Sequence, residues 1–112
     1  MKYIKLNQNE FPEYVDICGG GALDYLSLIV ESPWDGQRYL CSLSIKNKSD
    51  KDIYIKEMVV TIKKYNSTTT TETYTDKTIK AGTTSKIDSY NTSNSDYQWT
   101  RASKTSAVIQ FR

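Results

Sequence analysis

Apolar and polar residues alternate through the stretch from Tyr39 to Tyr65, and this stretch organises the predicted fold. In residues 39–46 nearly every second residue is apolar, which is typical of a strand with one buried face and one face in solvent. Residues 47–52, NKSDKD, carry side chains that hydrogen-bond their own backbone and favour a turn. The alternation resumes in residues 53–62. We therefore predict a hairpin of two long strands.

The second strand of this predicted hairpin contains a change of phase. Its apolar residues occupy odd positions before Lys56 and even positions after Glu57. A β-bulge at these two residues would keep all of the apolar side chains on one face, and we predict one there. The inward rows of the two strands are then expected to contain Leu43, Ile45, Val60 and Ile62.

Shorter strand signals precede this stretch. We predict one strand at residues 2–6, at the edge of a sheet, and another at residues 13–18. The consecutive Gly19, Gly20 and Gly21 favour a tight turn over an anion-binding nest, because no GxxxxGK[ST] pattern accompanies them.

Residues 22–32 fit both helical and strand spacing. The sequence that follows, SPWDG at residues 32–36, is strong turn chemistry. It favours the strand, paired as a hairpin with the strand that begins near Arg38.

The second half of the chain is rich in Ser and Thr, and its β-branched Thr residues favour strands over disorder. We predict strands at residues 72–80 and 85–91, joined by a turn around Gly82, and then a looser segment to residue 100. The apolar residues 106–111, SAVIQF, are expected to form a terminal strand that returns to the core sheet.

Seven or eight short strands without a helical pattern predict an all-β protein, an antiparallel immunoglobulin-like β-sandwich. The length of 112 residues suits one domain, residues 1–112, with a single core.

Two runs of this chain resemble the small bacterial immunoglobulin-like domains of the FxLYD type. They are SLSIKNKSDKDIYIKEMVVTIKKY and KTIKAGTTSKIDSY, and the resemblance, from the start of the first run to the end of the second, spans about half of the chain. The matching positions are Ile45, Asn47, Ile55, Val60, Ile62, Tyr65, Ile79 and Gly82. The resemblance implies a binding or spacer module, and it supplies no catalytic residue.

Composition argues against several functional classes. The chain has no His, the commonest general base and zinc ligand, so we expect neither an enzyme nor a metal site, and we expect no cofactor. A net charge of +2 gives no reason to expect nucleic acid as a partner. No apolar run has the length of a membrane span or a secretory signal, so we expect no membrane partner and a cytoplasmic location, or an extracellular one if the chain is a domain of a longer exported protein. We expect Cys18 and Cys41 to be free thiols, with a single disulfide as the alternative.

Aromatic residues in the polar second half are the candidate binding residues. The segment NTSNSDYQWTRAS surrounds Tyr97 and Trp99 with polar neighbours, so we expect both rings to be exposed and to anchor a protein interface. We add Arg101 to the same face, and Tyr90 as a further interface residue. In the competing interpretation Trp99 belongs to the core.

These residues suggest two functions. The first is a non-enzymatic protein-binding module, such as a cytosolic inhibitor or immunity protein from a phage or other mobile element. The alternative is an extracellular adhesion or carbohydrate-binding domain, in which Trp34 or Trp99 stacks on sugar.

Overall fold

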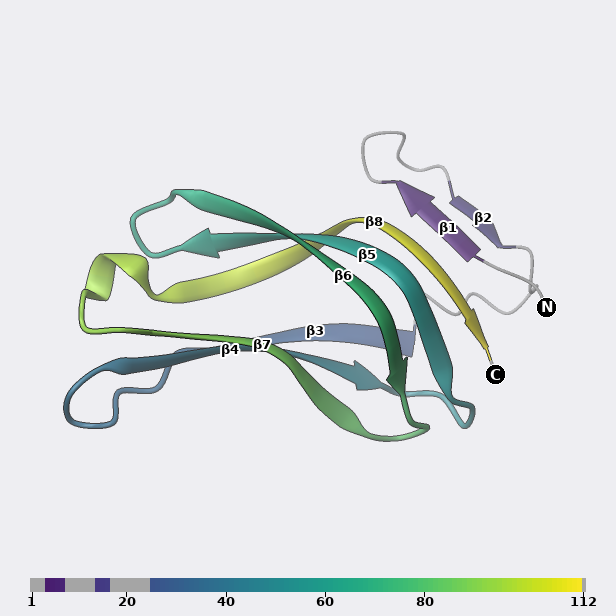
Figure 1. Ribbon diagram of the computed structural model, residues 1–112, viewed down its shortest axis with the longest axis horizontal. Helices are drawn as coiled ribbons and strands as arrows, with labels where there is room; N and C mark the ends of the chain where they lie inside the picture. Colours follow the sequence, from purple (N-terminus) through teal and green to yellow (C-terminus); the bar gives the residue numbers. More distant parts are fainter. Residues whose placement is uncertain (1–3, 8–13, 17–24, 112) are drawn as a thin grey trace.

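The computed structural model describes residues 4–7, 14–16 and 25–111, and it shows an all-β protein (Figure 1). A short 3₁₀ helix, η3 (Ser95–Tyr97), precedes the last strand. The described residues form eight strands: β1 (Ile4–Asn7), β2 (Tyr14–Asp16), β3 (Leu26–Glu31), β4 (Tyr39–Asn47), β5 (Ile53–Lys64), β6 (Thr69–Ile79), β7 (Thr84–Thr92) and β8 (Trp99–Phe111). The predicted all-β class is confirmed, and the eight strands of the described residues agree with the predicted seven or eight.

The strands form two antiparallel sheets that face each other as two layers (Figure 1). One sheet has the order β2-β1-β8-β5-β6, and the other has the order β3-β4-β7. Both sheets contribute apolar side chains to one common core. Its buried members are Leu26, Cys41, Leu43, Ile45, Ile53, Ile55, Met58, Val60, Ile62, Ile79, Trp99, Ala107 and Ile109.

The predicted central hairpin is wrong, because its two strands lie in different sheets. β4 pairs with β3 and β7, whereas β5 pairs with β6 and β8. Residues 48–52 carry the chain from one layer to the other. A strand with one buried face shows the same alternation whether its neighbour in sequence lies beside it or across the core, so the pattern alone does not separate the two arrangements.

The predicted inward rows are confirmed. Leu43, Ile45, Val60 and Ile62 are fully buried between the two layers. The predicted β-bulge is confirmed as well: the pairing of β5 with β8 changes register between Ile55 and Glu57. Cys41 is a buried free thiol, as expected, whereas Cys18 lies outside the described residues.

The adjacent residues Val60 and Thr61 provide a matched test of these faces. Val60→Ala should lower the free energy of unfolding by about 1 to 3 kcal/mol, because it removes buried methyl groups. Thr61→Ala, on the outward face, should change it by only about 0.5 kcal/mol. Chemical denaturation measures both, and a larger loss for Thr61→Ala would show that the faces are reversed.

Most of the other predicted strands are present, with corrections to their placement. The hairpin of β3 with β4 is confirmed, and β8 is the predicted terminal strand, although it begins at Trp99 within the segment expected to be looser. β6 and β7 match the predicted strands on either side of Gly82 but lie in different sheets. β1 is not an edge strand, because it lies between β2 and β8. The predicted turn at residues 19–21 lies outside the described residues.

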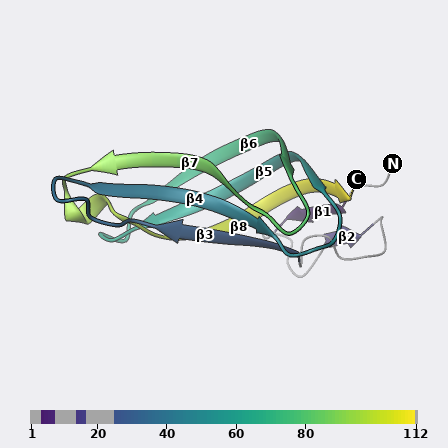
Figure 2. The same ribbon diagram turned by 90° about the horizontal axis from the view of Figure 1, so that it is seen from below.

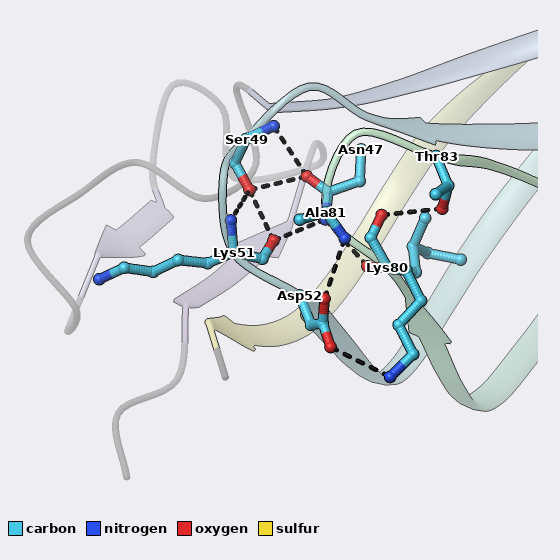
Figure 3. Close-up of polar contacts among 8 residues, drawn as sticks. Asn47, Ser49, Lys51, Asp52, Lys80, Ala81 and Thr83 are labelled. Carbon is cyan, nitrogen blue, oxygen red and sulfur yellow. Dashed lines mark hydrogen bonds and ion pairs between the residues drawn. The ribbon is translucent and has the colours of Figure 1, made fainter.

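Two arches at one end of the molecule join the layers, and Asn47 ties them together (Figure 3). Its buried amide Nδ2 donates to the carbonyls of Lys51, at 2.8 Å, and Ile79, at 2.9 Å. Its Oδ1 accepts from the backbone N–H and the hydroxyl of Ser49, at 2.9 and 2.7 Å. One side chain therefore links the arch after β4 to the end of β6.

Asp52 forms a second link between the same arches (Figure 3). It accepts a hydrogen bond from the backbone N–H of Ala81, at 2.9 Å, and lies 3.2 Å from the ammonium of Lys80. These two contacts hold the pKa of Asp52 below its usual value.

The long sides of the two layers are also bridged. Figure 2 shows β6 beside β7 on one side and β8 beside β3 on the other. The hydroxyl of Tyr74 on β6 donates to Asp88 on β7 at 2.6 Å, and the ammonium of Lys104 on β8 donates to the carbonyl of Leu26 on β3 at 2.9 Å. Burial and the hydrogen bond to Asp88 raise the pKa of the Tyr74 hydroxyl, so it stays protonated and keeps donating.

Candidate functional site

Three loops meet at the end of the molecule opposite the arches, on the left of Figure 1. They are residues 32–38 between β3 and β4, residues 65–68 between β5 and β6, and residues 93–98 between β7 and β8. We call this end the aromatic end, because aromatic side chains gather on it: Trp34, Tyr39, Tyr65, Tyr90, Tyr97 and Trp99.

The first loop is a turn fixed by Asp35. The Asp35 carboxylate accepts from the backbone N–H groups of Gln37, at 2.9 Å, and Arg38, at 2.8 Å, and these bonds hold the pKa of Asp35 below its usual value. Gly36 has φ +101°, a backbone conformation that glycine adopts without strain. The turn presents the Trp34 ring, which is 51% exposed and lies 4.7 Å from the ring of Tyr39.

The second and third loops are hydrogen-bonded to each other. The backbone N–H of Tyr65 donates to the carbonyl of Gln98 at 2.9 Å, and that of Asn66 donates to the carbonyl of Asp96 at 3.1 Å. Within the third loop, the side chain of Asn94 caps η3 by accepting from the N–H of Asp96 at 2.9 Å. Both loops are therefore held in place by backbone and side-chain bonds.

Aromatic side chains extend from the core to the surface at this end. Tyr90 lies opposite Cys41 in the register of β4 and β7, so its ring leans over the inner face. It stacks on Trp99 with ring centroids 6.1 Å apart, and it remains 44% exposed. Tyr97 is 41% exposed, and Tyr65, in the neighbouring loop, is 65% exposed. The hydroxyl of Ser32 donates to the backbone carbonyl of Trp99 at 2.9 Å, which ties the first loop to β8.

Two of the predicted interface residues lie as expected. Tyr90 and Tyr97 are exposed at the aromatic end.

Two other expectations about the site are wrong. Trp99 is only 9% exposed and belongs to the core, because β8 turns its ring inward beneath Tyr90. Arg101 does not extend the face of Trp99. In the register with β5, Trp99 lies opposite Lys64 and Arg101 lies opposite Lys63. The residue between them in β8 is therefore unpaired, and the side chains of Trp99 and Arg101 point to opposite faces of the sheet.

Sequence reasoning missed the partner of Trp34 and the contribution of Lys64. The ring of Tyr39 supports Trp34, and the ammonium of Lys64 lies 5.6 Å from the centre of the Tyr97 ring. The turn sequence at residues 32–36 was a signal for the first pair, because a tight hairpin brings the residues on either side of it together.

The side chains of the aromatic end define the contacts that it can make. In residues 4–7, 14–16 and 25–111, no group of three or more metal-ligating side chains could hold a metal ion. The aromatic end offers polar-tipped rings, amides and hydroxyls, groups that are common in the contact surfaces of binding proteins.

The opposite end has an open depression of about 360 Å³, lined by Tyr25, residues 48–51 and Phe111. The rings of Tyr25 and Phe111 meet edge to face, with their centroids 6.1 Å apart. Among the described lining residues, the charged side chains are those of Asp50 and its neighbours Lys48 and Lys51.

Comparison with known protein families, curated proteins and solved structures found no match to this chain. Within the part of the chain that the structure describes, no helix is long and apolar enough to cross a membrane.

Proposed function

We propose that this chain is a non-enzymatic protein-binding module that covers a partner's surface with its aromatic end. The observation that carries the proposal is the presence of four exposed rings at one end of the molecule: Trp34, Tyr65 and Tyr97 on loops that are hydrogen-bonded in place, and Tyr90 on β7. Tyr and Trp offer a large contact area at low entropic cost, and they dominate the binding energy of protein interfaces.

The rigidity of the loops supports this proposal. Binding normally costs free energy because loops and side chains must be ordered, and a loop that is already fixed avoids much of that cost. The bonds from Asp35, Asn94 and the backbone of residues 65 and 66 provide this order before any partner arrives. The surrounding Asn and Ser side chains add adaptable hydrogen bonds.

We further propose that the two layers form an immunoglobulin-like sandwich, related in architecture to the FxLYD-type domains. In immunoglobulin-type sandwiches the loops cluster at the two ends, and those of one end form the binding surface of variable domains. Within this class, a small inhibitor or immunity protein of a phage or mobile element would act by covering its partner, which is the role we assign to the aromatic end.

Replacing Tyr97 or Trp34 by alanine should weaken binding to a partner about thirtyfold, which corresponds to about 2 kcal/mol. The partner is first captured from an extract of the source cells by the immobilised protein, then purified, and its dissociation constant is measured for each variant. Tyr25→Ala is the matched control, because Tyr25 is also exposed but lies by the depression at the opposite end.

The melting temperature of each variant shows whether the fold is intact. Unchanged affinity of both folded aromatic-end variants, or an equal loss for Tyr25→Ala, would contradict the proposal.

A second candidate function is carbohydrate binding, which the exposed ring of Trp34 favours, because aromatic faces stack on sugar rings. A glycan array separates the two functions. Specific glycan binding that Trp34→Ala abolishes and Tyr97→Ala leaves unchanged would favour the carbohydrate-binding domain over the protein-binding module.

A further inference from the structure

Two cations face each other on the outer side of the five-stranded sheet, next to the aromatic end. Lys63 of β5 and Arg101 of β8 are directly opposite in the antiparallel register. Directly opposite residues have Cβ atoms about 4.5 to 5.5 Å apart, and like charges at such positions are destabilising. Arg101 is exposed and Lys63 is half-buried, so the pair lies at the surface.

This juxtaposition results from the change of register near the start of β8. Thr100 is the extra residue between the pairs Trp99–Lys64 and Arg101–Lys63, and its hydroxyl donates to the carbonyl of Lys63 at 2.9 Å. If β8 were paired regularly, with no bulge at Thr100, the side chains of Trp99 and Arg101 would alternate in the usual way and both would point to the inward face. The local backbone therefore turns a cation outward against another cation.

Nothing in the described residues neutralises this pair. Arg38 pairs with Asp35 and Lys80 pairs with Asp52, but within the described part of the chain no ion pair involves Lys63 or Arg101. On its other side Lys63 lies opposite Thr69 of β6, and the next row of the sheet consists of Thr71, Thr61 and Ser103. The two charges thus impose a cost on folding for which the fold itself offers no compensation.

A third cation connects this pair to the aromatic end. Lys64 follows Lys63 on the opposite face of β5, and its ammonium lies over the ring of Tyr97. A cation held over an aromatic ring remains available to an approaching anion on its solvent side. Lys63, Lys64 and Arg101 therefore surround the corner at which β5 ends and β8 begins, on the left of Figure 1. We call these three residues the cationic corner.

We propose that the cationic corner receives carboxylates from an acidic surface of a protein partner, while the rings of the aromatic end cover the adjoining apolar contact. This inference rests on the proposed function and adds the chemistry of the partner. Directly opposite like charges, such as those of Lys63 and Arg101, oppose folding, and residues that oppose folding without a compensating contact are expected at functional sites. Charge complementarity favours an acidic partner, because its carboxylates would relieve the repulsion between Lys63 and Arg101. The net charge of only +2 gives no general attraction to a phosphate backbone, so a protein partner is favoured over nucleic acid.

The test uses the full chain and a short polyglutamate peptide as the probe, with a polyglutamine peptide of equal length as the neutral reference. Backbone amide chemical shifts at residues 63, 64, 97 and 101 should change saturably with polyglutamate at low salt and not with polyglutamine. Arg101→Glu should weaken this binding about tenfold. It should also raise the melting temperature by about 1 to 4 °C, because Glu would form an opposite-charge pair with Lys63.

Lys86→Glu is the matched control, since Lys86 is an exposed cation on the three-stranded sheet and the charge change is the same. Its polyglutamate affinity should equal that of the unmodified chain. An equal loss for Lys86→Glu, no saturable shifts at the cationic corner, or a lower melting temperature for Arg101→Glu would each overturn the inference. Tighter binding of an oligothymidylate than of polyglutamate would overturn it in favour of nucleic acid.

The purified natural partner separates this inference from the proposed function. If Tyr97→Ala weakens binding and Arg101→Glu does not, the acidic-partner inference fails and the proposed function stands. If neither variant weakens binding, both fail.

Discussion

Replacing Trp99 by alanine is expected to lower the free energy of unfolding by about 3 to 5 kcal/mol, a large part of the stability of a small domain. The Trp99 ring is 9% exposed, packs with the buried residues of both sheets and stacks on Tyr90. Alanine would leave a cavity at the aromatic end, where the two layers close over the core. Chemical denaturation followed by circular dichroism measures the loss, since the midpoint shifts in proportion.

Tyr97→Ala is the control for Trp99→Ala, because Tyr97 lies two residues before Trp99 and has a ring that is 41% exposed. Tyr97→Ala should lower the free energy of unfolding by only about 0.5 to 1 kcal/mol, because it removes a surface cation–π contact between the Tyr97 ring and Lys64. An unchanged denaturation midpoint for Trp99→Ala, together with lost partner binding, would restore Trp99 as a binding anchor and contradict its assignment to the core.

The sequence predicts the strands and their buried faces well, because both depend on local alternation. Leu43, Ile45, Val60 and Ile62 occupy the predicted rows, and even the bulge after Ile55 follows from the change of apolar phase. The pairing of the strands depends instead on long-range geometry. Nothing in the alternation of β4 and β5 distinguishes a hairpin from an arch, so the assignment of these strands to one sheet failed.

The candidate site could be predicted only in part, for a similar reason. Tyr97 is exposed as expected, because its polar neighbours in sequence do leave it at the surface, and Tyr90, named as a further interface residue, is exposed as well. Trp99 has equally polar neighbours in sequence, yet the residues that bury it come from other strands. A single extra residue at Thr100 then places Arg101 on the other face, and a bulge inside a Ser- and Thr-rich strand changes no apolar phase that could reveal it.

The arches also show what the alternation misses. Asn47 ends β4 within a polar segment, NKSDKD, that predicts a solvent-exposed turn, yet its side chain is fully buried. Both amide hydrogens and both lone pairs of its oxygen have partners, which uses its entire hydrogen-bonding capacity. A polar residue that sequence reasoning assigns to a turn is therefore a buried link between the two layers.

Asn47→Ala is therefore expected to lower the free energy of unfolding by about 2 to 4 kcal/mol. It leaves the buried carbonyl of Ile79 without its amide donor, and an unpaired buried group costs about 1 to 3 kcal/mol. It also removes the amide hydrogen bond to the carbonyl of Lys51, which keeps the Ser49 hydroxyl as a donor, and the loss of such a bond costs about 1 kcal/mol. Asn47→Asp should cost at least as much, since a carboxylate offers no donor to those carbonyls and brings a charge into the interior. Ser49→Ala is the control: it removes a hydroxyl that bonds to the same Oδ1 but keeps both amide donors, and should cost about 0.5 to 1.5 kcal/mol. Denaturation midpoints that rank Ser49→Ala as the more damaging substitution would show that the link from Asn47 to Ile79 does not hold the arches together.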